Sequence, residues 1–136
     1  MNTEIFKTNT TKSPEKFIEY LKVSAQKSGF LVRDVHDMKQ IFNEHGVEVN
    51  ADFNYYMVQI CNPKKAYGSI STNPERGVLI PKFVMVFYDA KNKTTEIRFL
   101  NYGANFVKSL FEHDEVFQKT LPESCKTIIS IINDAV

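Results

Sequence analysis

The chain has 136 residues, 43% of them hydrophobic, which is a length typical of one domain and a composition able to form a core. Its 17 basic and 16 acidic residues nearly balance, which excludes the strong net charge that draws proteins to nucleic acid or to anionic membranes. No apolar run approaches the roughly 18 residues of a membrane span, and residues 1–7 lack the apolar block of a signal peptide, so we expect a cytoplasmic protein.

The N-terminal part of the sequence predicts a strand followed by a helix. Residues 4–10 can form a first edge strand. The segment Ser13-Pro14-Glu15 is typical of a helix start, and Gly29 marks the helix end. Between them, apolar residues recur at helical spacing at Phe17, Leu21 and Ala25.

A second strand and a second helix follow. Residues 30–35 are predicted to form a short strand, and Asp37 is placed to cap a helix that Gly46 ends. We expect that helix to bury a stripe formed by Met38, Ile41 and Phe42.

The middle of the chain predicts three strands around one further helix. Residues 53–60 form the first of these strands, and a helix capped by Asn62 runs to about Thr72. A connection rich in Pro and Gly occupies residues 73–81. Residues 83–88 and 95–100 then pair as a hairpin, because residues 89–94 between them have the polar composition of a hairpin loop.

Helical periodicity returns in the last third of the sequence. One helix is expected over residues 104–111. Another is expected after Pro122, with one apolar side formed by Ile128, Ile129, Ile132 and Val136. No internal repeat, low-complexity tract or linker divides the chain, so we predict a single domain over residues 1–136.

The most informative segment is the junction between the strand at 53–60 and the helix that follows it. Asn62 can cap free backbone N–H groups, and Pro63 suits the first helical position because it has no N–H there. Cys61 therefore lies just outside a helix N-terminus. The partial positive charge of that terminus, with Lys64 and Lys65 nearby, favours a thiolate or can hold a small anion.

These residues resemble a known family. The signature consists of an apolar strand, a Cys-Asn-Pro helix start and a step through a proline into the next strand. The residues that carry it here are 56–60, Cys61-Asn62-Pro63, Ala66, Ile70, Asn73-Pro74, Gly77, Leu79 and Pro81. It is similar to that of the domain of unknown function 302 family, most strongly over residues 13–100, whereas residues 104–136 match in helical character only. Lys82 stands where the family usually has a second cysteine, so a mechanism that needs two thiols from these motifs finds no support.

The resemblance implies an α+β fold with a mostly antiparallel sheet of about five strands. Helices would pack on one face of this sheet, in a β-α-β4-α arrangement like that of the TATA-box-binding protein. The resemblance also implies self-association, so a homodimer is expected, and it carries no agreed biochemical activity.

Alternation along the strand at 53–60 predicts the roles of the two sheet faces. Tyr56, Val58 and Ile60 form one apolar face, which we assign to the helices. Cys61 points with Gln59, Met57, Tyr55 and Phe53 to the other face, together with Glu96 and Arg98. That mixed face suits a subunit interface or a ligand cleft, and the alternative is that the C-terminal helices cover it.

Four basic residues flank the Cys-Asn-Pro motif, namely Lys64, Lys65, Arg76 and Lys82. If the connection at 73–81 folds back over the helix start, they can converge on a phosphate, sulfate or carboxylate. The alternative is that Lys64 and Lys65 are simply solvated. The predicted ligand-binding residues are therefore Cys61, Asn62, Lys64, Arg76 and Lys82.

Other candidate groups favour structural roles. Cys125 lies in a helical segment and is expected to pack, and both cysteines are expected to be reduced, although a bridge between them remains an alternative. His36 lies between Asp34 and Asp37, but neighbouring strand residues point to different faces, so no metal site is predicted. The sequence lacks G-x-G-x-x-G, P-loop, H-E-x-x-H and G-x-S-x-G motifs, so no cofactor is predicted.

The leading interpretation is a small ligand-binding or regulatory domain that self-associates, with a pocket beside Cys61. No covalent chemistry is required, and an enzymatic role is left open. The second interpretation makes Cys61 the working thiolate of a sulfur-transfer or redox protein, without support from a Cys-x-x-Cys pair or a nearby histidine. A third, nucleic-acid binding by the open sheet face, is disfavoured by the balanced charge.

Overall fold

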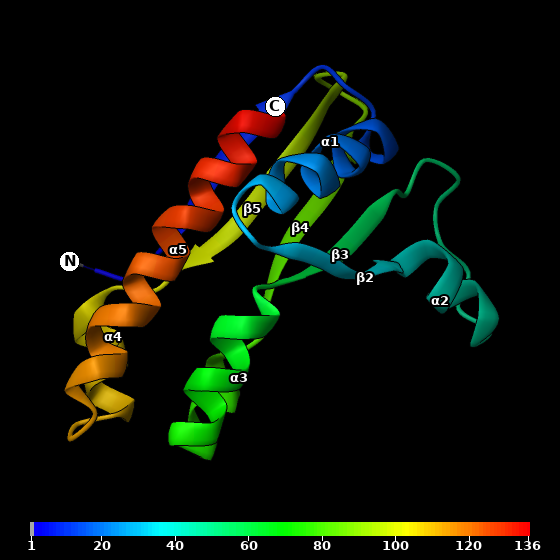
Figure 1. Ribbon diagram of the computed structural model, residues 1–136. Coiled ribbons are helices and arrows are strands. Elements are labelled where there is room, and N and C mark those ends of the chain that lie inside the picture. The colour runs from blue at the N-terminus through cyan, green and yellow to red at the C-terminus, as the bar shows by residue number, and fades with distance from the viewer. Residues whose placement is uncertain (1) are drawn as a thin grey trace.

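The computed structural model describes residues 2–136, and its strands form one five-stranded antiparallel sheet in the order β1-β5-β4-β3-β2 (Figure 1). The strands are β1 (Glu4–Thr10), β2 (Leu31–Asp37), β3 (Tyr55–Cys61), β4 (Lys82–Asp89) and β5 (Thr94–Asn101). The chain is an α+β protein with helices packed on an open sheet, as the sequence predicts. The hairpin β4–β5 is present, with Val84 opposite Phe99.

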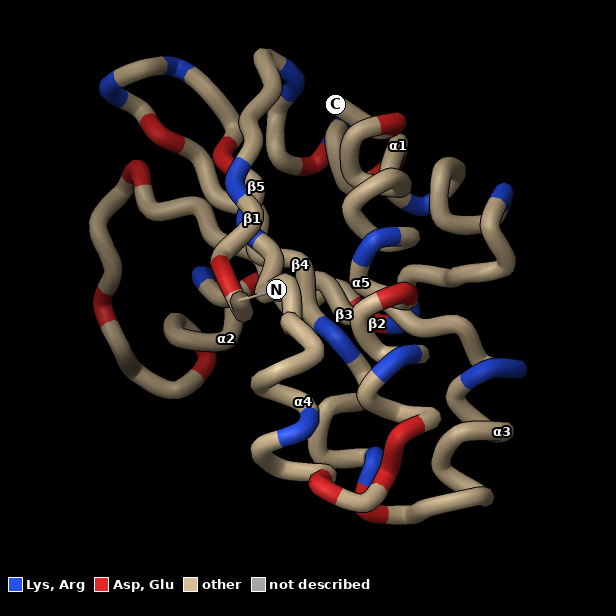
Figure 2. The backbone as a smooth tube through the Cα atoms, turned by 90° about the vertical axis from the view of Figure 1, so that its left-hand side faces the viewer, with Lys and Arg blue, Asp and Glu red and all other residues tan. Residues whose placement is uncertain are grey.

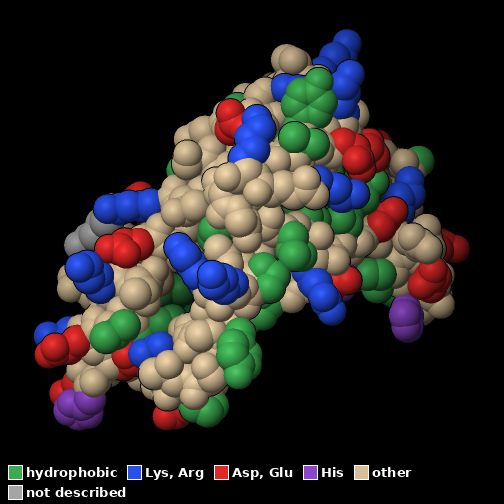
Figure 3. All heavy atoms as spheres, viewed as in Figure 1, with side chains coloured by type: hydrophobic (Ala, Val, Ile, Leu, Met, Phe, Trp, Pro, Cys, Tyr) green, Lys and Arg blue, Asp and Glu red, His purple; other side chains and the backbone are tan. Residues whose placement is uncertain are grey.

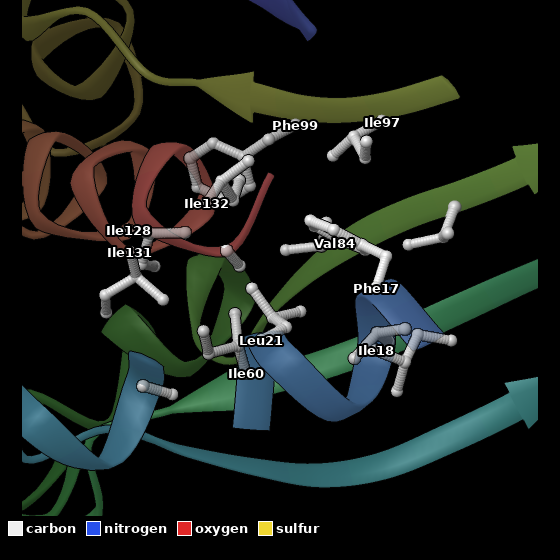
Figure 4. Close-up of a cluster of buried hydrophobic side chains, with 14 of the residues drawn as sticks. Phe17, Ile18, Leu21, Ile60, Val84, Ile97, Phe99, Ile128, Ile131 and Ile132 are labelled. Atoms are coloured by element: carbon white, nitrogen blue, oxygen red, sulfur yellow. The ribbon is translucent and has the colours of Figure 1, made fainter. Parts of the chain in front are cut away.

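Two long helices cover one face of the sheet. They are α1 (Pro14–Lys27) and α5 (Glu115–Ala135), and Figure 2 shows them on the same side of the strands. Val58 and Ile60 of β3 face these helices and are 0% and 1% exposed, so the predicted assignment of this face is confirmed. Figure 4 shows the resulting core, in which side chains of the two helices meet those of the strands, including Phe17, Leu21, Ile60, Val84, Ile97, Phe99, Ile128 and Ile132.

Helix α5 begins earlier than the sequence pattern indicates. We expected a helix after Pro122, but the helix starts at Glu115 and contains Pro122. The side chain of Asp114 caps it by accepting a hydrogen bond from the Phe117 N–H at 3.1 Å. Phe117 and Leu121 extend the apolar side of the helix toward its start, and their burial compensates for the backbone hydrogen bond that proline cannot donate.

The other face of the sheet, called the open face below, carries the side chains of Tyr55, Met57 and Gln59 from β3, with Phe87 of β4 and Arg98 of β5 in register beside them. Tyr55 and Phe87 stack with their ring centroids 5.3 Å apart. The C-terminal helix α5 lies on the opposite face, so it does not cover this one (Figure 2).

Helix α2 (Met38–Glu44) lies at the end of the open face. Asp37 caps it as predicted, through a hydrogen bond from the Gln40 N–H. The predicted buried stripe of Met38, Ile41 and Phe42 is only half-buried, because α2 packs at the margin of the sheet. There the ring centroids of Phe42 and Phe53 are 6.0 Å apart.

Beyond the end of the sheet, a second hydrophobic cluster joins the 3-10 helix η1 (Pro74–Leu79) and helix α4 (Ala104–Leu110) to the first half of α5. Helix α3 (Pro63–Thr72) packs against η1. The cluster consists of Leu79, Val107, Phe117 and Leu121. No helix among residues 2–136 combines the length and the apolar character needed to cross a bilayer.

Candidate functional site

The junction between β3 and α3 has the predicted geometry. Cys61 is the last residue of β3, Asn62 is the N-cap of α3, and Pro63 is its first residue. The Oδ1 atom of Asn62 accepts a hydrogen bond from the Lys65 N–H at 3.1 Å. Asn62 has φ −100° and ψ 101°, the extended backbone that an N-cap requires. The thiol therefore emerges from a strand directly ahead of a helical turn.

A cavity of about 100 Å³ lies beside this junction, between α3 and the first half of α5. Its lining includes Phe30 and Ile60 of the main core and Phe117 and Leu121 of the second cluster. In the space-filling view, basic side chains lie on the surface between α5 and α3 (Figure 3). The lining includes polar groups from four segments, namely Cys61, Asn62, Lys65, Ser69, Lys82, Thr120 and Ser124.

The structure brings together three of the five predicted ligand-binding residues. Cys61, Asn62 and Lys82 all line the cavity, and Lys65 does so from the first turn of α3. Lys64 is exposed and is not part of the lining. The first turn of α3 therefore offers the cavity one lysine, while its neighbour points elsewhere.

Arg76 has a different environment from the one expected. Its guanidinium binds the carboxylate of Asp114 through two hydrogen bonds of 2.8 Å, and the side chains of the pair are only 7% and 13% exposed. It also donates to the carbonyl oxygen and hydroxyl of Ser69 at 3.3 Å. The charge of Arg76 is thus neutralised within the protein, and its geometry serves to tie α3, η1 and the start of α5 together.

Asp114 completes this linkage. Hydrogen bonds from Arg76 lower the pKa of Asp114 to about 2, with further contributions from the Phe117 N–H and the Asn73 side chain that outweigh the effect of burial. Several hydrogen-bond donors favour the charged form of a carboxylate and fix the position of its side chain. The pair fixes the helix start that forms one wall of the cavity.

Lys82 is the basic group that enters the cavity from the sheet. It is the first residue of β4, opposite Ile60, so its side chain points to the helix side and is half-buried. Its Nζ atom donates a hydrogen bond to the Ser124 Oγ of α5 at 3.3 Å. Burial lowers the pKa of Lys82, and the nearby Cys125 and Cys61 oppose that shift only in part.

The environment of Cys61 does not activate its thiol. Burial raises the pKa of Cys61, and the positive charges of Lys82 and Arg33 offset that effect incompletely. This direction is opposite to the thiolate stabilisation that the helix N-terminus and Lys64 suggested. Cys125 is fully buried, its pKa is also raised by burial, and both cysteines are free thiols.

The wall of the cavity that α5 forms was not predicted from the sequence. Phe117, Thr120, Leu121 and Ser124 belong to this wall. The signal was the pattern Asp114, Phe117, Leu121, a cap followed by apolar residues at helical spacing, which the presence of Pro122 obscured.

Comparison with known proteins places the chain in a family. It matches the family described as domain of unknown function DUF302 over residues 6–134, so the chain belongs to that family. The crystal structure of an uncharacterised conserved DUF302 protein from Bacillus stearothermophilus is similar, with a TM-score of 0.81 and 17% sequence identity, covering 97% of this chain and 98% of that one. At this low identity, the structural similarity shows a shared fold alone. A comparison with curated proteins gives no match.

Proposed function

We propose that this protein is a small-ligand-binding domain that self-associates and that its cavity beside Cys61 holds a small carboxylate or a similar anion. Lys82 supplies the charge, Lys65 stands at the rim, and Asn62 and the hydroxyls of Ser69 and Ser124 orient the ligand. The cytoplasmic location expected from the sequence is part of this proposal.

The observation that carries the proposal is the environment of the Lys82 ammonium group. Among residues 2–136 no carboxylate forms an ion pair with it, and Ser124 is its hydrogen-bond partner. A half-buried ammonium without a counter-charge is costly, so either it loses its proton or an anion binds beside it. The adjacent cavity gives an anion the space to do so.

The backbone at the start of α3 contributes little to such a site. The Lys65 N–H is already bound by Asn62, and Pro63 has no N–H to donate. A bound anion must therefore be recognised mainly by side chains. Lys82 and Lys65 are the two basic side chains in the lining, which makes their removal the sharpest test of the site.

Self-association is proposed through the open face of the sheet. Ile5 and Leu100 are cross-strand partners on this face and are 58% and 39% exposed. The same face carries an ion pair in which the Arg98 Nη2 atom lies 3.0 Å from the Glu96 Oε1 atom. In two copies related by a two-fold axis, Arg98 of one copy can face Glu96 of the other around an apolar centre. The occupant we propose is a second copy of this chain.

The thiol-dependent alternative is the second candidate, because Cys61 lines the same cavity as Lys82. A sulfur-transfer or redox role needs a thiolate near neutral pH. The raised pKa of Cys61 opposes that requirement, so this candidate ranks below ligand binding.

A thermal-shift screen tests the binding proposal. Acetate, pyruvate, phosphate and sulfate are added to the wild-type chain and to Lys82→Met, Lys65→Met and Lys64→Met variants. We expect at least one anion to raise the Tm of the wild type, Lys82→Met to abolish the rise, and Lys64→Met, whose side chain lies outside the cavity, to retain it. No response to any of the anions, or a response that Lys82→Met retains, would contradict the proposal.

A further inference from the structure

Lys82 combines three features that rarely occur together in a lysine. Its side chain enters a cavity, it is half-buried, and its nitrogen is held by a neutral hydroxyl, that of Ser124 at 3.3 Å. Most lysines are exposed and strongly hydrated, and in that state their amines are protonated and unreactive.

Among residues 2–136, no carboxylate forms an ion pair with Lys82. The cavity is also lined by Cys61 of β3, Lys65 of α3 and Ser124 of α5, and the buried Cys125 interacts electrostatically with Lys82. The pKa of Lys82 is lowered by burial, so a larger fraction of its amine is neutral than in a solvated lysine. A neutral amine has a free electron pair and is a nucleophile.

We propose that the ε-amino group of Lys82 forms an imine with a small carbonyl compound that carries a carboxylate, such as an α-keto acid, bound in the cavity between α3 and α5. This proposal rests on the proposed anion-binding function and extends it to a covalent step. The protonated form of Lys82 pairs with a simple anion, and the neutral form of the same amine is the one that reacts with a carbonyl group. The cavity of about 100 Å³ is several times the space that one water needs, so a molecule of a few heavy atoms fits.

The two functional groups of such a ligand have separate partners. Its carboxylate can pair with the ammonium group of Lys65 at the rim, and its carbonyl carbon can approach the nitrogen of Lys82. Because Lys65 belongs to α3 and Lys82 to β4, the cavity separates the cation that binds from the amine that reacts. Holding the carbonyl next to the amine raises its effective concentration and thus the rate of addition.

The step is balanced without a further reagent. The electron pair of the Lys82 nitrogen attacks the carbonyl carbon, a C–N bond forms, and the carbonyl electron pair moves to the oxygen, which takes up the proton released by nitrogen. The Ser124 hydroxyl, within hydrogen-bond distance of that nitrogen, can pass this proton. Loss of water breaks the C–O bond and leaves the imine. No oxidation or reduction takes place.

Reductive trapping tests the proposal on the full chain. The protein is incubated with pyruvate and sodium cyanoborohydride, which reduces an imine to a stable secondary amine, and the modified lysines are located by peptide mass spectrometry. We expect Lys82 to be modified about tenfold faster than Lys64, which is exposed and outside the cavity. The Lys82→Met and Lys82→Arg variants should lose this adduct, and Lys64→Met should keep it.

A second measurement separates this proposal from the anion-binding function and does not depend on variants that fold poorly. Acetate, which has a carboxylate but forms no imine, should slow the modification of Lys82 in the wild type and leave Lys64 unaffected. If pyruvate raises the Tm but Lys82 is modified no faster than Lys64, anion binding stands and the imine proposal is overturned. If neither pyruvate nor acetate binds and the lysines react at equal rates, both are overturned.

Discussion

The guanidinium of Arg76 and the carboxylate of Asp114 form a buried ion pair, although the two residues are 38 positions apart in the sequence. Two hydrogen bonds of 2.8 Å join them. Asp114 is also the N-cap of α5, and Arg76 also binds the Ser69 carbonyl near the end of α3. The pair therefore holds together the two helices that form the walls of the cavity. A residue predicted to contact ligand instead supports the shape of the site.

Breaking this pair should destabilise the protein strongly. Arg76→Met leaves the Asp114 carboxylate buried without its counter-charge, so we expect a loss of about 3–5 kcal/mol in the free energy of unfolding. Urea denaturation measures this loss. The double variant with Asp114→Asn should be more stable than the sum of the single effects predicts. Additive effects would show that the ion pair contributes no coupling energy.

Stability should fall at low pH because of Asp114. Its folded-state pKa of about 2 lies below the ordinary value of 3.8, so the folded protein binds fewer protons than the unfolded chain between these values. The stabilisation is therefore complete above about pH 4 and is lost as the pH falls toward 2. Urea unfolding of the wild type and of Asp114→Asn over this range measures it, and the variant should show the shallower decline. Equal slopes would contradict the assignment to Asp114.

Cys61 should react slowly with iodoacetamide near neutral pH. Burial raises its pKa, so its thiolate fraction is below that of an unperturbed cysteine. A Cys125→Ser background leaves Cys61 as the single thiol, and an unstructured cysteine peptide serves as the reference. Lys82→Met should slow the reaction further, since the Lys82 charge lowers the pKa of Cys61. Labelling faster than the peptide would restore the thiol-dependent alternative.

Self-association should depend on the open face. Sedimentation velocity at micromolar concentration is expected to show a dimer for the wild type, and Leu100→Glu should weaken it by at least about tenfold in Kd, or about 1.4 kcal/mol. Val116→Glu is the matched control, because Val116 is 63% exposed near the start of α5, away from this face. A monomeric wild type, or a dimer that Leu100→Glu leaves intact, would contradict the proposed interface.

Local sequence signals predicted most of the fold because they act over short distances. Asp37 and Asn62 each cap the helix they were expected to cap, a helix starts at the segment Ser13-Pro14-Glu15 as predicted, and the strand at residues 4–10 has the predicted bounds. Strand alternation placed Val58 and Ile60 on the buried face for the same reason. These features need only a residue and its near neighbours.

The parts that could not be predicted depend on contacts between distant segments. Arg76 meets Asp114 only after α3 and α5 have packed, so its burial leaves no local signal. Pro122 suggested a helix start, whereas the tertiary burial of Phe117 and Leu121 extends the helix across it. The raised pKa of Cys61 results from burial that the helix-end argument did not include. The cavity wall on α5 was missed because Pro122 obscured the helical pattern that precedes it.

Binding of an anion beside Lys82 is the central claim, and amide NMR tests it most directly. In a titration of ¹⁵N-labelled protein with acetate, we expect saturable shifts of the amides of Lys65, Ser69, Lys82 and Ser124, which line the cavity, and no such shifts in Lys82→Met. Shifts confined to residues outside the cavity, or no shifts at millimolar acetate, would contradict the claim.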